Sequence, residues 1–279
     1  MRTLFVAGIC GLSLLMSGCG ETSSESASET NPESADGLAA ASAEASEGTG
    51  MSDAESEEDP PAEEFGPAPE GKVLRHAVFF GFRDSTSEEQ IQEVVDAFRG
   101  LPEKIDAITD FAWGTNNSPE KLDDGFTHCF LLTFEDEAGR AEYLPHPAHK
   151  EFGKVLSGRN DQTFVFDYWG TPAEELPEKQ LLHAVFFRFK EDAPEEGIRK
   201  VEEEFAALPS RIPEIKAFEW GTNNSPEAKD DGFTHCFLVT FASEEDRQVY
   251  LDHPDHVAFV EVLKPVLDAP RVLDFWAQQ

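Results

Sequence analysis

The feature that most constrains this chain is an internal duplication. Four groups of residues recur at a constant offset of 107, with no gap between His76 and Trp169. They are His76 to Phe80 and His183 to Phe187, Trp113 to Pro119 and Trp220 to Pro226, Asp124 to Phe130 and Asp231 to Phe237, and the set Tyr143, His146, Pro147, His149 with Tyr250, His253, Pro254, His256. Solenoid repeats are shorter and more numerous. The duplication therefore predicts two copies of one small domain, over residues 72–170 and 179–277.

Each copy has the same predicted order of elements. In the first copy, apolar runs predict strands over 73–82, 108–115, 126–135 and 163–169. Apolar residues at helical spacing predict a helix over 87–100, and a second helical stretch covers 136–157 with an interruption at its prolines. The order β-α-β-β-α-β is the ferredoxin-like arrangement.

The third predicted strand is apolar on both of its faces. One face carries His128, Phe130, Leu132 and Phe134, and the other carries Cys129 and Leu131. An antiparallel sheet with helices on one side usually exposes its other side to water. Because neither face here is polar, we expect the sheets of the two copies to pack against each other. The prediction is an α+β fold in which two ferredoxin-like units form a dimeric α+β barrel within one chain.

The four repeated motifs together resemble the stress-responsive A/B barrel (Dabb) family. The resemblance rests on the opening His-x-Val-x-Phe, the Trp-Gly, the Gly-Phe-Thr-His and the Tyr-x-x-His-Pro-x-His motifs, which occur in this order in both copies. It implies dimeric α+β barrels, in agreement with the strand faces. A tandem chain then supplies both halves of the barrel itself.

All eight histidines lie in the two copies at matched positions, and an imidazole can exchange a proton near neutral pH. The resemblance to polyketide cyclases of the family implies that Tyr143 with His149, and Tyr250 with His256, are acid–base pairs. These four residues are the catalytic candidates.

Four further histidines are candidates for ligand binding: His76, His128, His183 and His235. They lie in predicted strands, on faces that we expect to line the barrel interior. The resemblance also implies that Phe98 and Phe205 occupy positions where a cyclase has a pocket tyrosine, so the same substrate is doubtful. The alternative is that the strand histidines are core residues bonded to backbone carbonyls, or part of a network between the sheets. His146 and His253 fit a turn or helix-cap role better than catalysis.

Nothing in the sequence predicts a metal or a cofactor. The His-x-x-His pair has an intervening proline and lacks nearby paired carboxylates, so a zinc site is not expected. No single histidine is distinguished as a haem ligand. We interpret Cys129 and Cys236 as small buried apolar side chains.

The N-terminus resembles a bacterial lipoprotein signal. Arg2 precedes an apolar run over 4–16 that is too short to span a bilayer as a helix. The run ends in Leu15-Met16-Ser17-Gly18-Cys19, which resembles a lipobox. We predict a signal peptide over 1–18, lipidation of Cys19 and localisation in the cell envelope, without distinguishing the inner from the outer membrane.

Acidic residues concentrate between Cys19 and the first copy. The chain has a net charge of -34, and residues 20–71 contain 15 acidic and no basic residues. Such a composition predicts a disordered tether over 19–71. Dense negative charge also excludes nucleic acid as a partner.

Three functions remain open from the sequence. The leading expectation is a lipid-anchored protein that binds a small apolar or aromatic molecule in the barrel, because some of the 23 phenylalanines could line a cavity. The first alternative is a cyclase-like or isomerase enzyme that uses the Tyr/His pairs. The second is a structural or stress-protective module without a ligand.

Overall fold

A computed structural model describes residues 65–279. Residues 1–64, with the predicted signal peptide, Cys19 and most of the predicted tether, lie outside the described residues. The first copy comprises β1 (Val73–Phe82), α1 (Glu88–Arg99), β2 (Asp110–Thr115), β3 (His128–Phe134), α2 (Glu137–Tyr143), α3 (Pro147–Leu156) and β4 (Asn160–Gly170). The second comprises β5 (Leu181–Phe189), α4 (Glu195–Arg211), β6 (Ala217–Thr222), β7 (His235–Phe241), α5 (Glu244–Asp252), α6 (Pro254–Leu263) and β8 (Leu267–Trp276).

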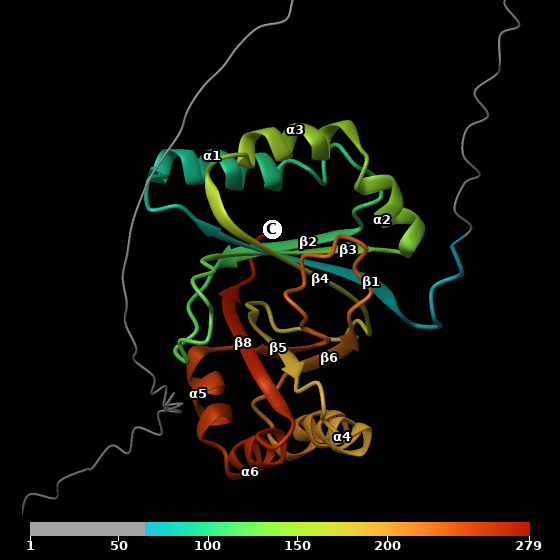
Figure 1. The fold of residues 1–279 in the computed structure, drawn as a ribbon, viewed down its shortest axis with the longest axis vertical. Coiled ribbons are helices and arrows are strands. Elements are labelled where there is room, and N and C mark those ends of the chain that lie inside the picture. The colour runs from blue at the N-terminus through green and yellow to red at the C-terminus, as the bar shows by residue number, and fades with distance from the viewer. Residues whose placement is uncertain (1–64) are drawn as a thin grey trace, which may run out of the picture. The chain divides into compact units, whose positions relative to one another are not determined.

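Each copy forms one antiparallel sheet of four strands, in the order β2-β3-β1-β4 and β6-β7-β5-β8. Helices α1 to α3 lie beyond the outer face of the first sheet, and α4 to α6 lie beyond the second (Figure 1). The predicted ferredoxin-like α+β fold is therefore confirmed. Among residues 65–279, no helix combines the length and the hydropathy needed to cross a membrane.

Local sequence explains where the helices begin. Ser87 accepts a hydrogen bond from the Gln90 backbone while the Gln90 side chain bonds back to Ser87, a reciprocal cap. Helix α3 begins with Pro147, and the His146 side chain accepts from the Ala148 backbone at 3.2 Å. His253 caps α6 in the same way. The predicted cap role of the two His-Pro pairs is confirmed.

Alternation along the strands divides each sheet into two buried faces. Side chains such as Val78 and Phe80 face the helices of their own copy. Side chains such as Ala77 and Phe79 belong to a different cluster, which includes Phe186 and Leu238 of the second copy. The sheets therefore pack face to face, as the two apolar faces of the third predicted strand indicated.

One expectation about these faces is wrong. We expected the strand histidines to line the space between the sheets. His76 instead shares a face with Val78 and Phe80, under the helices, because side chains two residues apart point to the same side of a strand. His183 lies likewise in the second copy, where it contacts Tyr250 of α5.

One long loop of each copy crosses to the other copy. The β2–β3 loop, residues 116–127, bonds to β8: the Asn117 amide donates to the Asp274 carbonyl at 2.8 Å. The β6–β7 loop, residues 223–234, bonds to β4 in the same manner. Both loops contain non-glycine residues with φ between 50° and 59°, namely Lys121, Asp124, Ala228 and Asp231. Such conformations are unfavourable and need support from surrounding contacts, which the opposite copy supplies.

Candidate active sites

A buried chain of three charged groups lies beneath the helices of the first copy. His76 and Asp167 are cross-strand partners on β1 and β4, and His76 Nδ1 lies 2.7 Å from Asp167 Oδ1. Arg140 of α2 donates through Nη1 to the other carboxylate oxygen at 2.8 Å. Neither Asp167 nor Arg140 is among the residues predicted from the sequence. The signal available there is an aspartate inside the apolar run from Phe164 to Trp169, because a buried carboxylate requires a partner.

This row of charged groups sets the protonation of His76. Burial alone would lower the pKa of His76, but the carboxylate of Asp167 outweighs burial and leaves that pKa above its ordinary value. Burial would raise the pKa of Asp167, yet the charges of His76 and Arg140 hold it below its usual range. The arrangement therefore favours an imidazolium, a carboxylate and a guanidinium in a row.

Tyr143 and His149 complete this site. Tyr143, at the end of α2, has its ring centroid 5.5 Å from that of His76 and 4.3 Å from that of His149. Burial raises the pKa of Tyr143, so its hydroxyl keeps its proton. Burial lowers the pKa of His149, although a hydrogen bond to the Leu144 carbonyl opposes this effect. Because Nδ1 of His149 donates to that carbonyl at 3.0 Å, its Nε2 carries the free lone pair.

The second copy repeats this geometry closely. His183 Nδ1 lies 2.7 Å from Asp274 Oδ1, and Arg247 donates to Asp274 at 2.7 Å. The Tyr250 ring lies 4.3 Å from that of His256 between centroids. Burial, aided by the charge of His183, lowers the pKa of His256 to about 4. The structure thus brings together six of the ten catalytic and ligand-binding candidates, as two matched trios.

His128 and His235 lie outside these trios. His128 pairs with Phe80 across the ladder, whereas His76 pairs with Leu132. Four residues of strand separate the two histidines, or roughly 13 Å at the usual rise. His128 bonds to Thr127 and packs edge-on against Phe82. His235 bonds to Glu202 at 2.9 Å. Both sit at the far end of the helix-covered face.

Phe98 and Phe205 are core residues in this structure. Phe98 packs against Phe130 and Phe152, with centroid separations of 4.2 and 4.7 Å. Phe205 packs against Phe237 at 4.4 Å and against Phe259 at 4.6 Å. Both are almost wholly buried. They fill the space between helix and sheet rather than bordering an open pocket.

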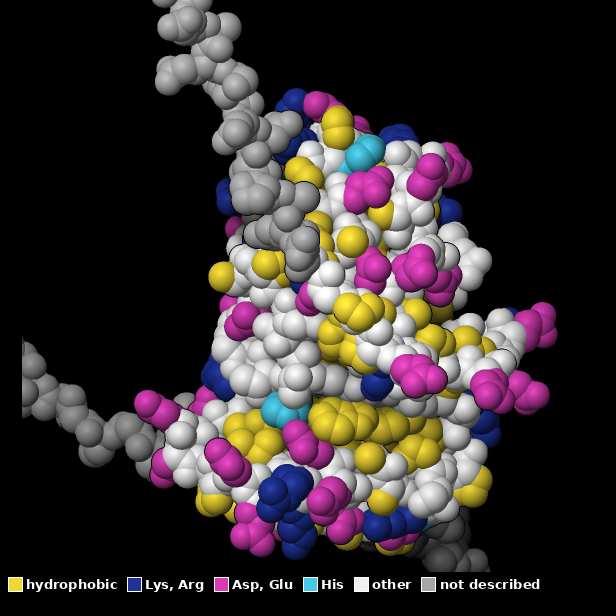
Figure 2. All heavy atoms as spheres, turned by 90° about the vertical axis from the view of Figure 1, so that its right-hand side faces the viewer, with side chains coloured by type: hydrophobic (Ala, Val, Ile, Leu, Met, Phe, Trp, Pro, Cys, Tyr) yellow, Lys and Arg dark blue, Asp and Glu magenta, His cyan; other side chains and the backbone are white. Residues whose placement is uncertain are grey.

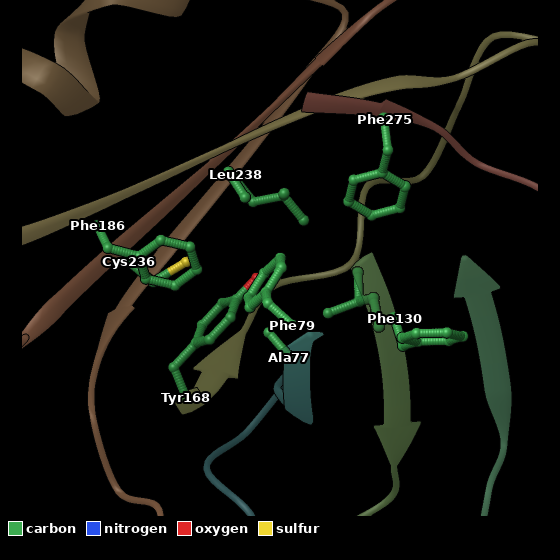
Figure 3. A pocket seen from close by; sticks show the side chains of 10 residues that line it. Ala77, Phe79, Phe130, Tyr168, Phe186, Cys236, Leu238 and Phe275 are labelled. Atoms are coloured by element: carbon green, nitrogen blue, oxygen red, sulfur yellow. The ribbon is translucent and has the colours of Figure 1, made fainter. Parts of the chain in front are cut away.

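The space between the two sheets is also filled. Figure 3 shows the cavity there, surrounded by aromatic and aliphatic side chains such as Phe79, Phe186 and Phe275. Its volume is about 10 Å³. That is room for about one water molecule, not for an aromatic ligand. A larger cleft, of about 250 Å³, opens at one end of the sheets, where Arg75 pairs with Glu219.

Each site also receives groups from the opposite copy. The β6–β7 loop places Glu227 Oε1 3.9 Å from His76 Nε2, and Arg140 donates to the carbonyl and the side chain of Asn224 at 3.0 Å. In return, the β2–β3 loop places Glu120 Oε2 3.9 Å from His183 Nδ1. Both sites are therefore shared between the copies. These crossing residues are not among those predicted from the sequence.

Among the described residues, the groups that can donate or accept a proton at these sites are the side chains of the trios. Within residues 65–279, no group of three or more His, Cys, Asp or Glu side chains is arranged to hold a metal ion. Cys129 and Cys236 are free and buried, and burial raises the pKa of both thiols. On the face drawn in Figure 2, basic side chains stand in small groups among acidic ones.

Comparison with known proteins agrees with this architecture. The chain is 38% identical over 95 residues to "Stress-response A/B barrel domain-containing protein HS1" of Arabidopsis thaliana, covering 34% of this chain and 87% of that protein. It is 30% identical over 96 residues to "Olivetolic acid cyclase" of Cannabis sativa, covering 34% of this chain and 95% of the cyclase.

A solved structure of an anthrone oxidase-like protein covers 75% of this chain and 93% of its own, with a TM-score of 0.51 and 12% identity, a likeness of fold alone. The model of the Stress responsive A/B Barrel Domain matches residues 74–170 and again residues 181–277. The chain therefore belongs to the stress-responsive A/B barrel (Dabb) family and carries two of these domains in tandem.

Proposed function

We propose that each copy binds a small organic molecule with a carbonyl group beside its Tyr/His trio and moves a proton on it. The observation that carries the proposal is the trio in each copy. A neutral imidazole with a free Nε2 (His149) lies beside a protonated phenol (Tyr143) and an imidazolium (His76). A base beside two proton donors suits the removal of a proton next to a carbonyl group.

The proposed step uses each group of the trio once. His149 Nε2 takes a proton from the carbon next to the carbonyl, so the C–H bond breaks and an N–H bond forms. The electron pair moves toward the carbonyl oxygen, giving an enolate. The Tyr143 hydroxyl and the free N–H of His76 donate hydrogen bonds to that oxygen, while Asp167 holds His76 in position. His256, Tyr250, His183 and Asp274 have the same roles in the second copy.

The likeness to a cyclase supports this reaction class. The Tyr/His acid–base pair that the sequence resemblance assigns to cyclases falls on Tyr143 and His149, which the structure brings into ring contact. The residues that close the site differ, since Phe98 and Phe205 fill the space beneath the first helix of each copy. We therefore propose a small carbonyl compound and not the substrate of the cyclase.

A ligand-free structural module is the second candidate. The filled space between the sheets favours it, because a cavity of about 10 Å³ leaves no room for a ligand there. Tyr143 and His76 are also almost fully buried, at 1% and 2% exposure. Under this alternative the trios only stabilise the fold.

Native mass spectrometry of the full chain purified from its source distinguishes the two candidates. We expect a co-purifying small molecule that is lost from a His149→Ala/His256→Ala variant. The matched control is His128→Ala/His235→Ala, which removes histidines from the same sheets away from the trios and should retain the molecule. Incubation in D₂O should add deuterium next to the carbonyl of that molecule, at a rate that depends on His149 and His256. Absence of any retained molecule, with both variants folded, would favour the structural module.

We further propose that the chain is anchored in the cell envelope by lipid on Cys19. The proposal rests on the apolar run and the Leu-Met-Ser-Gly-Cys sequence that precedes a long acidic segment. Mass spectrometry of the mature N-terminal peptide should find acyl chains on Cys19. A Cys19→Ala variant should leave the membrane fraction, and a variant that stays there without acyl chains would overturn the proposal.

A further inference from the structure

The two crossing loops differ at one position that bears on the sites. In the first site, Glu227 forms an ion pair with Lys229, with 2.7 Å between Nζ and Oε2. The matched glutamate of the second site is Glu120, and the residue matched to Lys229 is Leu122. Leu122 packs instead against the core beneath α4 and α6. Glu120 therefore lacks the cation that accompanies its counterpart.

The surroundings of the two carboxyl groups differ as well. Glu227 faces Nε2 of His76, the nitrogen that Asp167 leaves free. Glu120 faces Nδ1 of His183, which is already bonded to Asp274. Among the described residues, Oε2 of Glu120 is out of contact with solvent and has no hydrogen-bond partner.

Three charged side chains face Glu120 from the second copy: His183 on β5, Asp274 on β8 and Arg247 on α5. Burial raises the pKa of Glu120, His183 and Arg247 oppose this effect, and Asp274 reinforces it. The pKa of Glu120 lies above its ordinary value as a result. Two carboxyl groups at one imidazole nitrogen cannot both ionise without repulsion.

We infer that Glu120 completes the second site as a neutral carboxylic acid, a proton donor that the first site lacks because Glu227 is ion-paired with Lys229. This inference rests on the proposed function, since a donor matters only where a ligand binds. An O–H group at this point suits the oxygen of a carbonyl or carboxylate group. The two sites of the chain are then chemically different, although their trios are the same.

Titration of the Glu120 carboxyl group in the full chain tests this without any ligand. Glutamate labelled with ¹³C at the side-chain carboxyl gives one resonance for each residue, and the resonance lost in Glu120→Gln belongs to Glu120. We expect that resonance to titrate at higher pH than an ordinary glutamate, whose pKa is about 4.3. In Leu122→Lys it should titrate at lower pH. The backbone positions match, because Val272 bonds to the Leu122 carbonyl at 2.9 Å as Val165 bonds to that of Lys229 at 3.0 Å.

The matched control is Lys229→Leu, which removes the cation of the other loop and should leave the Glu120 titration unchanged. An ordinary titration of Glu120, or a titration that Leu122→Lys does not lower, would overturn the inference.

If Leu122→Lys fails to fold, thermal unfolding of Glu120→Gln tests the inference instead. A carboxyl group with a raised pKa in the folded state makes stability fall as pH rises above the pKa of the unfolded chain. Glu120→Gln removes that dependence while keeping the shape of the side chain. We expect the difference in Tm between Glu120→Gln and the wild type to rise by at least about 2 °C from pH 4 to pH 7, in favour of the variant. A difference in Tm that stays constant across this range would overturn the inference.

These results separate the inference from the proposed function. An ordinary Glu120 titration together with a molecule lost on His149→Ala/His256→Ala removes only the special role of Glu120. A raised titration in a chain that never retains a molecule removes the proposed function instead.

Discussion

Arg75 lies on the face of the first sheet that meets the second copy, and the matched position of the second copy holds Leu182. Arg75 donates to both carboxylate oxygens of Glu219, at 2.9 and 3.2 Å, and the matched residue of Glu219 is Ala112. The charged contact at this end of the interface therefore occurs once, not twice. Where the sheets meet, the copies differ in charge and share mainly their packing.

Beneath the helices the copies are alike. The separation between His Nδ1 and Asp Oδ1 is 2.7 Å in both copies, and each aspartate bonds to an arginine of the second helix of its copy, Arg140 on α2 or Arg247 on α5. The contrast has a physical reason. An ion pair within an interface can be exchanged as a whole for apolar residues at little cost, whereas a buried carboxylate that loses only its cation carries a large penalty.

Removing Arg140, the cation that pairs with Asp167 beneath the helices, should have the largest effect on stability. Arg140→Leu leaves the carboxylate of Asp167 buried beside His76 alone, and we expect a loss of about 3–5 kcal/mol in the free energy of unfolding. Urea denaturation of the full chain measures this loss. Arg247→Leu in the second copy should cost a similar amount. A loss below about 1 kcal/mol in both variants would show that the chain of charges is not a requirement of the fold.

The ion pair between the sheets should matter less. Glu219→Ala leaves Arg75 without its partner and removes the acceptor of the Tyr168 hydroxyl, which lies 2.9 Å from Glu219. We expect a loss of about 1–3 kcal/mol by urea denaturation. The triple variant Arg75→Leu/Tyr168→Phe/Glu219→Ala replaces each residue by the apolar residue found at its matched position in the other copy. Those residues are Leu182, Phe275 and Ala112. This variant should recover most of that loss, and a triple variant weaker than Glu219→Ala would contradict the contrast.

The two kinds of histidine should respond to pH in opposite directions. The pKa of His76 is raised in the folded state, so its contribution to stability is complete below about pH 6.5 and is lost as pH rises through the folded value. The pKa of His256 is lowered to about 4, so the unfolded chain binds more protons between that value and about 6.5. Stability therefore rises with pH in that window.

Thermal unfolding between pH 4 and pH 9 distinguishes these contributions. His256→Gln should reduce the slope of the profile on the acidic side only, and His76→Gln should reduce it on the alkaline side only, because His149 and His183 keep their contributions. The expected changes are a few degrees in Tm, about 2–4 °C for each kcal/mol. Identical profiles for both variants would argue against the assigned protonation states.

The smallest effect is expected at His128 and His235. His235 bonds to Glu202 at 2.9 Å, and the residue of the first copy that matches Glu202 is Val95. His235→Ala should therefore cost about 0.2–1 kcal/mol more than His128→Ala, the usual range for partly exposed pairs. Paired urea denaturation curves measure the difference. A larger cost for His128→Ala would indicate that it has a partner beyond Thr127.

The strands and helices themselves were within reach of the sequence. The predicted strand over 73–82 coincides with β1, and the predicted helix over 87–100 exceeds α1 by one residue at each end. The matched helix of the second copy shows where a repeat alone falls short. Helix α4 extends to Arg211 because Ala207 replaces Gly100, and glycine is a poor helix former.

The site could be predicted only in part. Alternation tells which side chains share a face of a strand, and so it grouped His128 with Phe130, Leu132 and Phe134. It does not tell which face the helices cover, so the expected position between the sheets was wrong. Asp167 lies 91 residues from His76, and a pairing at that distance leaves no local pattern in the sequence. The crossing of the β2–β3 and β6–β7 loops is equally non-local.

Those crossing loops have a consequence for how the sites can diverge. In a dimer of identical chains, one codon encodes the same loop residue over both sites, so every substitution changes both at once. Here the loop over each site is encoded in the opposite half of one gene. A single substitution at position 122, such as an exchange between lysine and leucine, alters the surroundings of His183 and leaves those of His76 unchanged. The fusion of two copies thus allows the residues around one trio to change while those around the other stay the same.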